Sequence, residues 1–168
     1  MLSGFKDNQK RALEDLLRSY GIKLPGELSN AQKDSMACPA LPTCGLAITE
    51  SERALPAAID QIESELARLG LSEQRIVIRM TGCPNGCSRP YNADIAFVGK
   101  SVGTYNVYVG GNLIGDRLNF VFAEKVTEKA LATTVIPLLS IYKKERKLGE
   151  SFGDYCFRVG KEKLQKVP

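Results

Sequence analysis

The stretch Thr81-Gly82-Cys83-Pro84-Asn85-Gly86-Cys87-Ser88-Arg89-Pro90-Tyr91 places two cysteines inside a turn-forming segment. A second pair lies upstream, in Cys38-Pro39-Ala40-Leu41-Pro42-Thr43-Cys44. The spacing is therefore C-x5-C, an interval of 38 residues, and C-x3-C. Four thiolates can hold either a tetrahedral zinc ion or an iron-sulfur cluster. Zinc sites favour tighter loops around one small ion, whereas a cluster offers four separate iron corners, so this spacing favours a cluster.

The composition narrows the choice of ligands. The chain of 168 residues has five cysteines and no histidine, which excludes histidine-ligated zinc, a histidine general base and the c-type haem attachment motif. With 43% hydrophobic and 25% charged residues, it has the composition of one globular domain with a short appended piece. An odd number of closely spaced cysteines favours metal or redox chemistry under reducing conditions over a disulfide framework.

The two ends of the chain indicate the cellular compartment and the kind of binding partner. No run of eighteen apolar residues occurs, and residues 1–6 lack the apolar stretch of a secretory signal. We therefore expect a protein of the cytoplasm, or of the plastid stroma in a photosynthetic eukaryote, without a membrane partner. From Lys143 onward, eight Lys or Arg accompany four Asp or Glu, a net +4 that equals the charge of the whole chain. This basic end suits an acidic electron carrier or solvent, and without a nucleic-acid motif it does not favour nucleic acid.

Hydrophobic periodicity predicts the secondary structure. We expect helices over residues 5–20, from an N-cap at Thr49 through residue 68, and over residues 127–148. Strands are expected over residues 75–80, 93–99 and 104–110, the last two as a hairpin or meander. Residues 118–122 fit either a strand or a helix. The second cysteine pair then follows a strand end, and the first lies in a proline-broken loop. The apolar stripes of the second and third helices should face the core: Leu55, Ile59, Ile62, Leu66, Leu131, Val135, Leu138, Leu139 and Tyr142.

The order of the cysteines and their flanking residues resemble the sirohaem-containing sulfite and nitrite reductases. The resemblance runs from about Phe5 to Lys163. Gly86 and the continuation over residues 88–91 are closer to the sulfite branch, because nitrite reductases tend to carry serine at the position of Gly86. The other matching segments are Ser35-Met36-Ala37, Tyr105-Asn106-Val107, Gly110-Gly111-Asn112 and Phe152-Gly153-Asp154-Tyr155.

This resemblance implies a fold and a division of the chain. The expected fold is α+β, a mixed sheet with flanking helices, preceded by the end of a ferredoxin-like repeat domain. Residues 1–34 would form the tail of that preceding half-domain and a connector, and residues 35–168 the domain of the 4Fe-4S cluster and the sirohaem proximal ligand. The chain would correspond to the C-terminal third of a longer enzyme. Because the basic residues that bind sulfite would lie elsewhere, the fragment alone is expected to be inactive.

The resemblance also implies a set of cofactor ligands. Cys38, Cys44, Cys83 and Cys87 would hold a 4Fe-4S cluster, and the thiolate of Cys87 would in addition bind the sirohaem iron. No side chain stores electrons, so the six-electron reduction of sulfite to sulfide would depend on these two cofactors. Cys156 matches no ligand position, and we interpret it as a buried or semi-exposed structural thiol.

Three further residues of the second loop are candidates for contact with sirohaem. Gly86 would let the backbone approach a flat macrocycle, and the Asn85 amide could orient the thiolates. Arg89 could pair with a carboxylate of the macrocycle. Simpler explanations stay open, because Pro-Asn-Gly is a strong turn sequence and Arg89 could form a surface salt bridge.

The resemblance alone decides neither the electron donor nor the choice between the main function and two alternatives. The Arg89-Pro90-Tyr91 stretch and the Lys161-Glu162-Lys163-Leu164 ending look more like ferredoxin-dependent enzymes than like the NADPH-linked type served by a flavoprotein reductase. One alternative is a fragment of a sirohaem nitrite reductase. The other is a zinc-binding interaction module, built on the same four cysteines, whose basic tail binds a partner.

Overall fold

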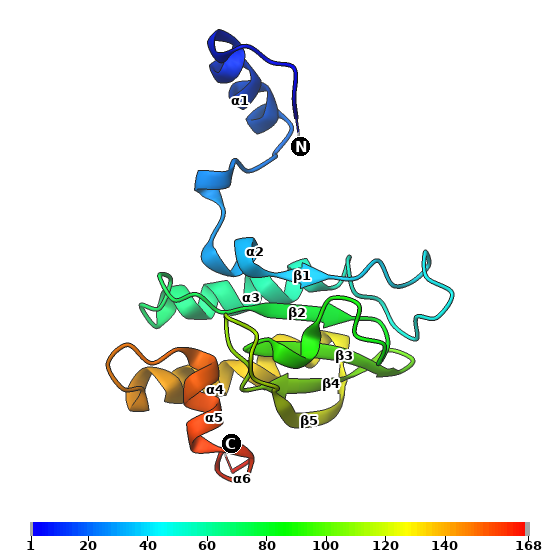
Figure 1. Ribbon diagram of the computed structural model, residues 1–168, viewed down its shortest axis with the longest axis vertical. Coiled ribbons are helices and arrows are strands. Elements are labelled where there is room, and N and C mark those ends of the chain that lie inside the picture. The colour runs from blue at the N-terminus through cyan, green and yellow to red at the C-terminus, as the bar shows by residue number, and fades with distance from the viewer. Residues whose placement is uncertain (1, 167–168) are drawn as a thin grey trace.

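A five-stranded mixed sheet forms the body of the protein in the computed structural model, which describes residues 2–166 (Figure 1). The strands follow one another in chain order, with β1 paired to β2 and β2 to β3 in parallel, and β3 to β4 and β4 to β5 antiparallel. The prediction of a mixed α+β sheet is confirmed. The strands are β1 (Met36–Ala37), β2 (Ile78–Thr81), β3 (Ile95–Ser101), β4 (Thr104–Val109) and β5 (Phe120–Thr127).

Helices cover one face of this sheet. They are α3 (Leu55–Arg68), α4 (Leu131–Glu145), α5 (Phe152–Val159) and the short α6 (Lys161–Leu164). The apolar stripes predicted for α3 and α4 are buried, and they join side chains of β2, β3 and β4 in one continuous core. Phe97, at the centre of β3, is fully buried in it. Burial of this apolar stripe, more than helix propensity, holds each helix in place.

The opposite face of the sheet is packed more sparsely. Because side chains alternate along a strand, Ile78 and Met80 enter the main core while Arg79 lies on the other side. The buried apolar residues on that side form a separate small cluster with the partly buried Tyr108 beside it: Val77, Ala93 and Ala96. The segment that carries the second cysteine pair folds back over this face, where the 3-10 turn η3 (Pro90–Asn92) contacts β2 and β3.

The amino-terminal segment stands apart from this body (Figure 1). It consists of the 3-10 turn η1 (Asp7–Gln9), α1 (Lys10–Ser19) and the 3-10 turn η2 (Pro25–Glu27). The next helix, α2 (Asn30–Asp34), packs against α3 and buries Ala31 in the main core. None of the residues of α1 is buried. α2 begins at a capping box, in which the Ser29 hydroxyl accepts a hydrogen bond from Gln32 N at 3.0 Å.

Two predicted starts of elements were wrong. The first helix begins at Lys10 and not at residue 5, because the chain before it forms the turn η1. Thr49 does not cap the second helix, which begins at Leu55 with Pro56 in its first turn. The backbone N–H of Thr49 instead donates to the carbonyl of Gly82 at 3.0 Å, so this residue closes the first cysteine loop.

The strand boundaries also differ from the prediction. β2 begins at Ile78 and not at residue 75, because Val77 N donates to the Asp94 carboxylate at 2.9 Å and not to a neighbouring strand. The ambiguous residues 118–122 lead into β5, which continues to Thr127. The last predicted helix therefore begins later, at Leu131, and Pro137 lies inside it without ending it. The predicted hairpin of β3 and β4 is confirmed. Within residues 2–166, no helix has the length and apolar character needed to cross a membrane.

Candidate metal centre

The two cysteine loops leave the sheet at the same edge. In the parallel pair β1 and β2, Ala37 lies opposite Met80, and Cys38 N donates to the Met80 carbonyl at 3.2 Å. The next residues of each strand are therefore neighbours, and both loops start from the carboxyl ends of adjacent strands (Figure 1). Ends of parallel strands meet at one edge, which is where sheets of this type place ligand sites.

Gly82 connects the two loops. Its N–H donates to the Cys38 sulfur at 3.4 Å, and its carbonyl accepts hydrogen bonds from Ile48 N at 2.8 Å and Thr49 N at 3.0 Å. A Cβ atom at this position would lie 2.6 Å from the Ala40 Cβ and 2.6 Å from the Thr49 carbonyl oxygen. Only glycine therefore permits this approach.

The second loop is a turn folded against an aromatic ring. Gly86 has a φ of +72°, and its carbonyl accepts a hydrogen bond from Arg89 N at 2.8 Å. The Tyr91 hydroxyl donates to the Pro84 carbonyl at 2.7 Å. A Cβ at Gly86 would lie 2.9 Å from Tyr91 Cε2, so the ring and the turn fit only with glycine here. The turn alone is thus a sufficient reason for glycine at position 86, and the neighbouring Asn85 is exposed.

The five thiols lie in different environments. Cys38 and Cys44 are half-buried, Cys83 is buried and Cys87 is exposed. Cys156 is fully buried in the main core, and burial raises the pKa of its thiol far above the usual value. Of the two predicted environments for Cys156, buried or semi-exposed, the structure shows the buried one.

The structure brings the loops together but does not gather their sulfurs at one point. Among residues 2–166, no three Cys, Asp or Glu side chains are placed to hold a single metal ion. In a 4Fe-4S cluster each thiolate binds its own iron. The donor chemistry of the four thiols and the position of the two loops fit such a cluster.

Two arginines give the site a positive charge. The Nη1 atom of Arg79 donates to the Ser88 carbonyl at 3.1 Å, while its Nε atom is buried and has no hydrogen-bond partner among the described residues. Burial, and then the nearby guanidinium of Arg89, lower the pKa of Arg79. Two guanidinium groups beside the second loop suit the binding of an anionic group. A thiolate-bound cluster and a carboxylate-rich macrocycle are both anionic groups.

The sequence analysis missed Arg79. Its signal is a charged residue inside the otherwise apolar strand Ile76-Val77-Ile78-Arg79-Met80, directly before the cysteine motif. A long cationic side chain at such a position must reach an acceptor or solvent.

A cavity of about 240 Å³ lies beside the second loop. It contains two of the residues predicted to contact sirohaem, Gly86 and Arg89. The full lining is Gly86, Arg89, Tyr91, Asn92 and Leu118.

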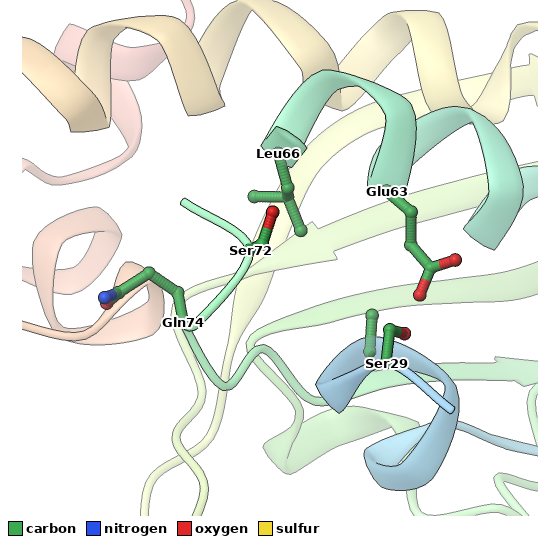
Figure 2. A pocket seen from close by; sticks show the side chains of 6 residues that line it. Ser29, Glu63, Leu66, Ser72 and Gln74 are labelled. Atoms are coloured by element: carbon green, nitrogen blue, oxygen red, sulfur yellow. The ribbon is translucent and has the colours of Figure 1, made fainter. Parts of the chain in front are cut away.

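A second, smaller cavity of about 50 Å³ lies between α2 and α3, where Figure 2 shows the Glu63 carboxylate pointing toward Ser29. One carboxylate oxygen of Glu63 accepts a hydrogen bond from Gln32 Nε2 at 3.2 Å, and the other is buried with no partner in the part of the chain that the structure describes. The cavity is also lined by Ser72 and Gln74, which precede β2. It therefore lies toward the amino ends of the strands, away from the cysteine loops.

A family model and curated relatives match most of the chain. The family model described as the nitrite and sulphite reductase 4Fe-4S domain matches residues 30–167. The "Sulfite reductase [NADPH] hemoprotein beta-component" of Staphylococcus carnosus is 46% identical over 160 residues, which are 95% of this chain and 28% of that protein. The "Sulfite reductase [ferredoxin]" of Synechococcus elongatus is 46% identical over 156 residues, which are 93% of this chain and 25% of that protein. The chain therefore spans about a quarter of the length of these relatives.

Solved structures share the fold. The Mycobacterium tuberculosis NirA protein superposes with a TM-score of 0.79 at 24% identity, over 96% of this chain and 31% of that one. Dissimilatory sulfite reductase I (DsrI) superposes with a TM-score of 0.68 at 13% identity, over 98% of this chain and 58% of that one. At these identities the likeness concerns the arrangement of sheet and helices.

Proposed function

Because the chain belongs to the nitrite and sulphite reductase 4Fe-4S domain family, we propose that it is the cluster-binding part of a sulfite reductase. The reaction is the six-electron reduction of sulfite to sulfide. The observation that carries the proposal is the joining of the two cysteine loops at Gly82, beyond the carboxyl ends of β1 and β2. The names of the relatives favour sulfite over nitrite as the substrate.

In this proposal Cys38, Cys44, Cys83 and Cys87 would hold a 4Fe-4S cluster, and Cys87 would also hold the iron of sirohaem. A cluster joined to an iron tetrapyrrole supplies the multi-electron chemistry that amino acids cannot. The task of the chain is to bind and orient. The Gly82 N–H fixes the Cys38 sulfur. The exposed position of Cys87 leaves room for a second metal on its thiolate.

The surroundings of Cys87 would position the macrocycle. We assign Gly86 and Arg89, which line the 240 Å³ cavity, to contacts with its ring and with a carboxylate. Asn85, which is exposed between the two cysteines of the second loop, would orient the thiolates.

The domain division and the donor are also proposed. Residues 1–34 would belong to the end of a ferredoxin-like half-domain, supported by the lack of any buried residue in α1, and residues 35–168 to the cluster domain. We propose ferredoxin as the electron donor on the strength of the Arg89-Pro90-Tyr91 stretch and the basic ending. The cytoplasm or the plastid stroma is the proposed compartment, because reducing conditions keep these thiols available as ligands.

Cys87→Ser in the full-length protein tests this function. A serine hydroxyl is a harder and poorer ligand for iron, so both the tetrapyrrole spectrum and the cluster signal should change, and sulfite turnover should fall at least about a hundredfold. Cys156→Ser is the matched control and should alter neither spectrum. Turnover is measured with reduced ferredoxin and, separately, with NADPH and a flavoprotein reductase.

Each result has a defined meaning. Loss of turnover in Cys87→Ser, with activity retained in Cys156→Ser, supports the assignment of Cys87. An unaltered tetrapyrrole spectrum and near-normal turnover in Cys87→Ser would overturn it. A wild-type protein that reduces nitrite much faster than sulfite would make it a nitrite reductase instead. Faster turnover with the flavoprotein system would replace ferredoxin as the proposed donor.

A further inference from the structure

A buried tyrosine of the sheet holds the far end of the first cysteine loop. Tyr105, in β4, is fully buried in the main core, and its hydroxyl donates to the Glu50 carbonyl at 2.7 Å. Burial raises the pKa of Tyr105 to about 12, so the hydroxyl stays protonated and able to donate at neutral pH. The Glu128 carboxylate is 3.5 Å away, which leaves the Glu50 carbonyl as the principal acceptor.

A glycine beside Tyr105 lets the loop come close to the sheet. Tyr105 lies opposite Gly99 in the pairing of β3 with β4, and residues paired in this way point to the same face. A Cβ atom at Gly99 would lie 2.6 Å from Thr49 Oγ1 and would also meet the Gly82 carbonyl. The end of the first loop therefore lies over the strand position next to Tyr105.

Glu50 extends this contact back into the loop. Its carboxylate accepts a hydrogen bond from Arg53 Nε at 2.6 Å. The guanidinium of Arg53 also donates to the carbonyl of Leu41, which lies midway between Cys38 and Cys44. Hydrogen bonds thus connect the core, through Glu50 and Arg53, to the middle of the ligand loop.

We propose that Tyr105 is a positioning residue of the metal centre, which acts through Glu50 and Arg53 to fix the loop that carries Cys38 and Cys44. The inference rests on the proposed function, because it concerns the hold on two thiolates of the cluster. The hydrogen bonds to Gly82 join one cysteine loop to the other, whereas the bond from Tyr105 joins the loop to the sheet. Supporting hydrogen bonds from rigid elements keep metal ligands in a fixed geometry.

Tyr105→Phe in the full-length protein tests this role, because it removes the hydroxyl and leaves the ring in the core. Tyr142→Phe is the matched control, since Tyr142 is also fully buried and its hydroxyl donates to a backbone carbonyl, that of Glu150, at 2.7 Å. The same hydroxyl lies 3.1 Å from the side chain of Gln74, which precedes β2. Tyr142 therefore lies toward the amino ends of the strands, away from the cysteine loops.

The two variants should differ at the cluster and not in stability. Each loses a buried hydrogen bond, so their urea midpoints should fall by similar amounts. Loss of iron to a chelator without oxygen should be about fivefold faster in Tyr105→Phe, and within about twofold of the wild-type rate in Tyr142→Phe. The electron paramagnetic resonance signal of the reduced cluster should change shape only in Tyr105→Phe. In protein freed of iron, amide hydrogen exchange over residues 38–50 should be faster only in that variant.

Other results overturn the inference. Equal acceleration of iron loss in both variants would show that Tyr105 contributes stability alone, and a wild-type rate, signal and exchange in Tyr105→Phe would also contradict its role. If Tyr105→Phe does not fold, Arg53→Ala decides, because Arg53 is exposed and links Glu50 to Leu41. Iron loss at the wild-type rate in Arg53→Ala then contradicts the proposal. A wild-type protein without iron and sulfide overturns the proposed function itself, whereas identical behaviour of the two Phe variants overturns only the role of Tyr105.

Discussion

The helix-covered face of the sheet buries a continuous apolar core, whereas the opposite face carries a small apolar cluster, a half-buried arginine and the second cysteine loop. Phe97 and Ala96 are neighbours in β3 that point to these two faces. The first lies among large apolar side chains, and the second lies beside Val77, Ala93 and the partly buried Tyr108.

The helix-covered face therefore provides most of the stability, and the opposite face provides the ligand site. The packed face fixes the positions of the strand ends, so the loops that leave them start from a rigid edge. The opposite face contributes less apolar burial, and on it the Arg79 Nε atom has no hydrogen-bond partner within residues 2–166. Sites built on rigid elements hold their ligands more accurately than sites on free loops.

The largest expected loss of stability comes from truncating Phe97 on the helix-covered face. Tyr108 on the opposite face provides the comparison. Phe97→Ala should lower the free energy of unfolding by about 3–5 kcal/mol, because it leaves a cavity in a closely packed core. Tyr108→Ala should cost less, about 1–2 kcal/mol, since this residue is only partly buried and its main aromatic contact is Tyr91, with ring centroids 5.6 Å apart. Urea unfolding measures both values. Equal losses would contradict the division between the two faces.

A pH effect is expected where the two faces meet. Burial raises the pKa of Asp94 from 3.8 to about 6, although its carboxylate accepts hydrogen bonds from Val77 N and Gly153 N, both at 2.9 Å. Asp154 adds to this rise, and Arg117 opposes it. Because the folded-state pKa is the higher one, the contribution of Asp94 to stability is fully present below about pH 4 and is lost as the pH rises through 6, by about 3 kcal/mol.

Asp94→Asn isolates this effect. Asparagine does not titrate, so the wild type should lose more stability than the variant between pH 4 and pH 7. The shifts of other carboxyl groups, such as Glu150 with its pKa lowered to about 2 by Arg158, are common to both proteins. Urea unfolding at the two pH values gives the comparison. Parallel pH profiles would show that the two N–H donors keep Asp94 ionised in the folded protein.

A further loss of stability is expected at the junction of the cysteine loops. Gly82→Ala should cost about 1–3 kcal/mol, because the added methyl group meets the Ala40 Cβ and the Thr49 carbonyl at 2.6 Å. It should also lower the content of iron and sulfide. Gly45→Ala is the matched control, because Gly45 lies beside Cys44 with no atom within 4 Å of the added methyl group, so its stability should change by less than about 0.5 kcal/mol. Equal iron contents in the two variants would argue against Gly82 as the junction.

The sequence predicted the parts of this structure that depend on local patterns. The stripes of α3 and α4, the hairpin of β3 and β4 and the strand before the second cysteine pair follow from periodicity and turn residues. Thr49 shows where such reasoning fails. Its local context resembles a helix cap, but Gly82, which is 33 positions later in the chain, accepts its N–H. Arg79 was missed for a similar reason, because its partner Ser88 lies on a loop that returns over the sheet.

The central claim is that the two cysteine loops hold one 4Fe-4S cluster, and the metal and sulfide content of the anaerobically purified full-length protein tests it most directly. We predict roughly four irons and four acid-labile sulfides for each chain, with a broad brown absorbance. Replacing Cys38, Cys44 or Cys83 by serine should lower both contents together, whereas Cys156→Ser should leave them unchanged. A colourless protein with a single zinc and no sulfide, which loses that zinc in the same three variants, would contradict the account.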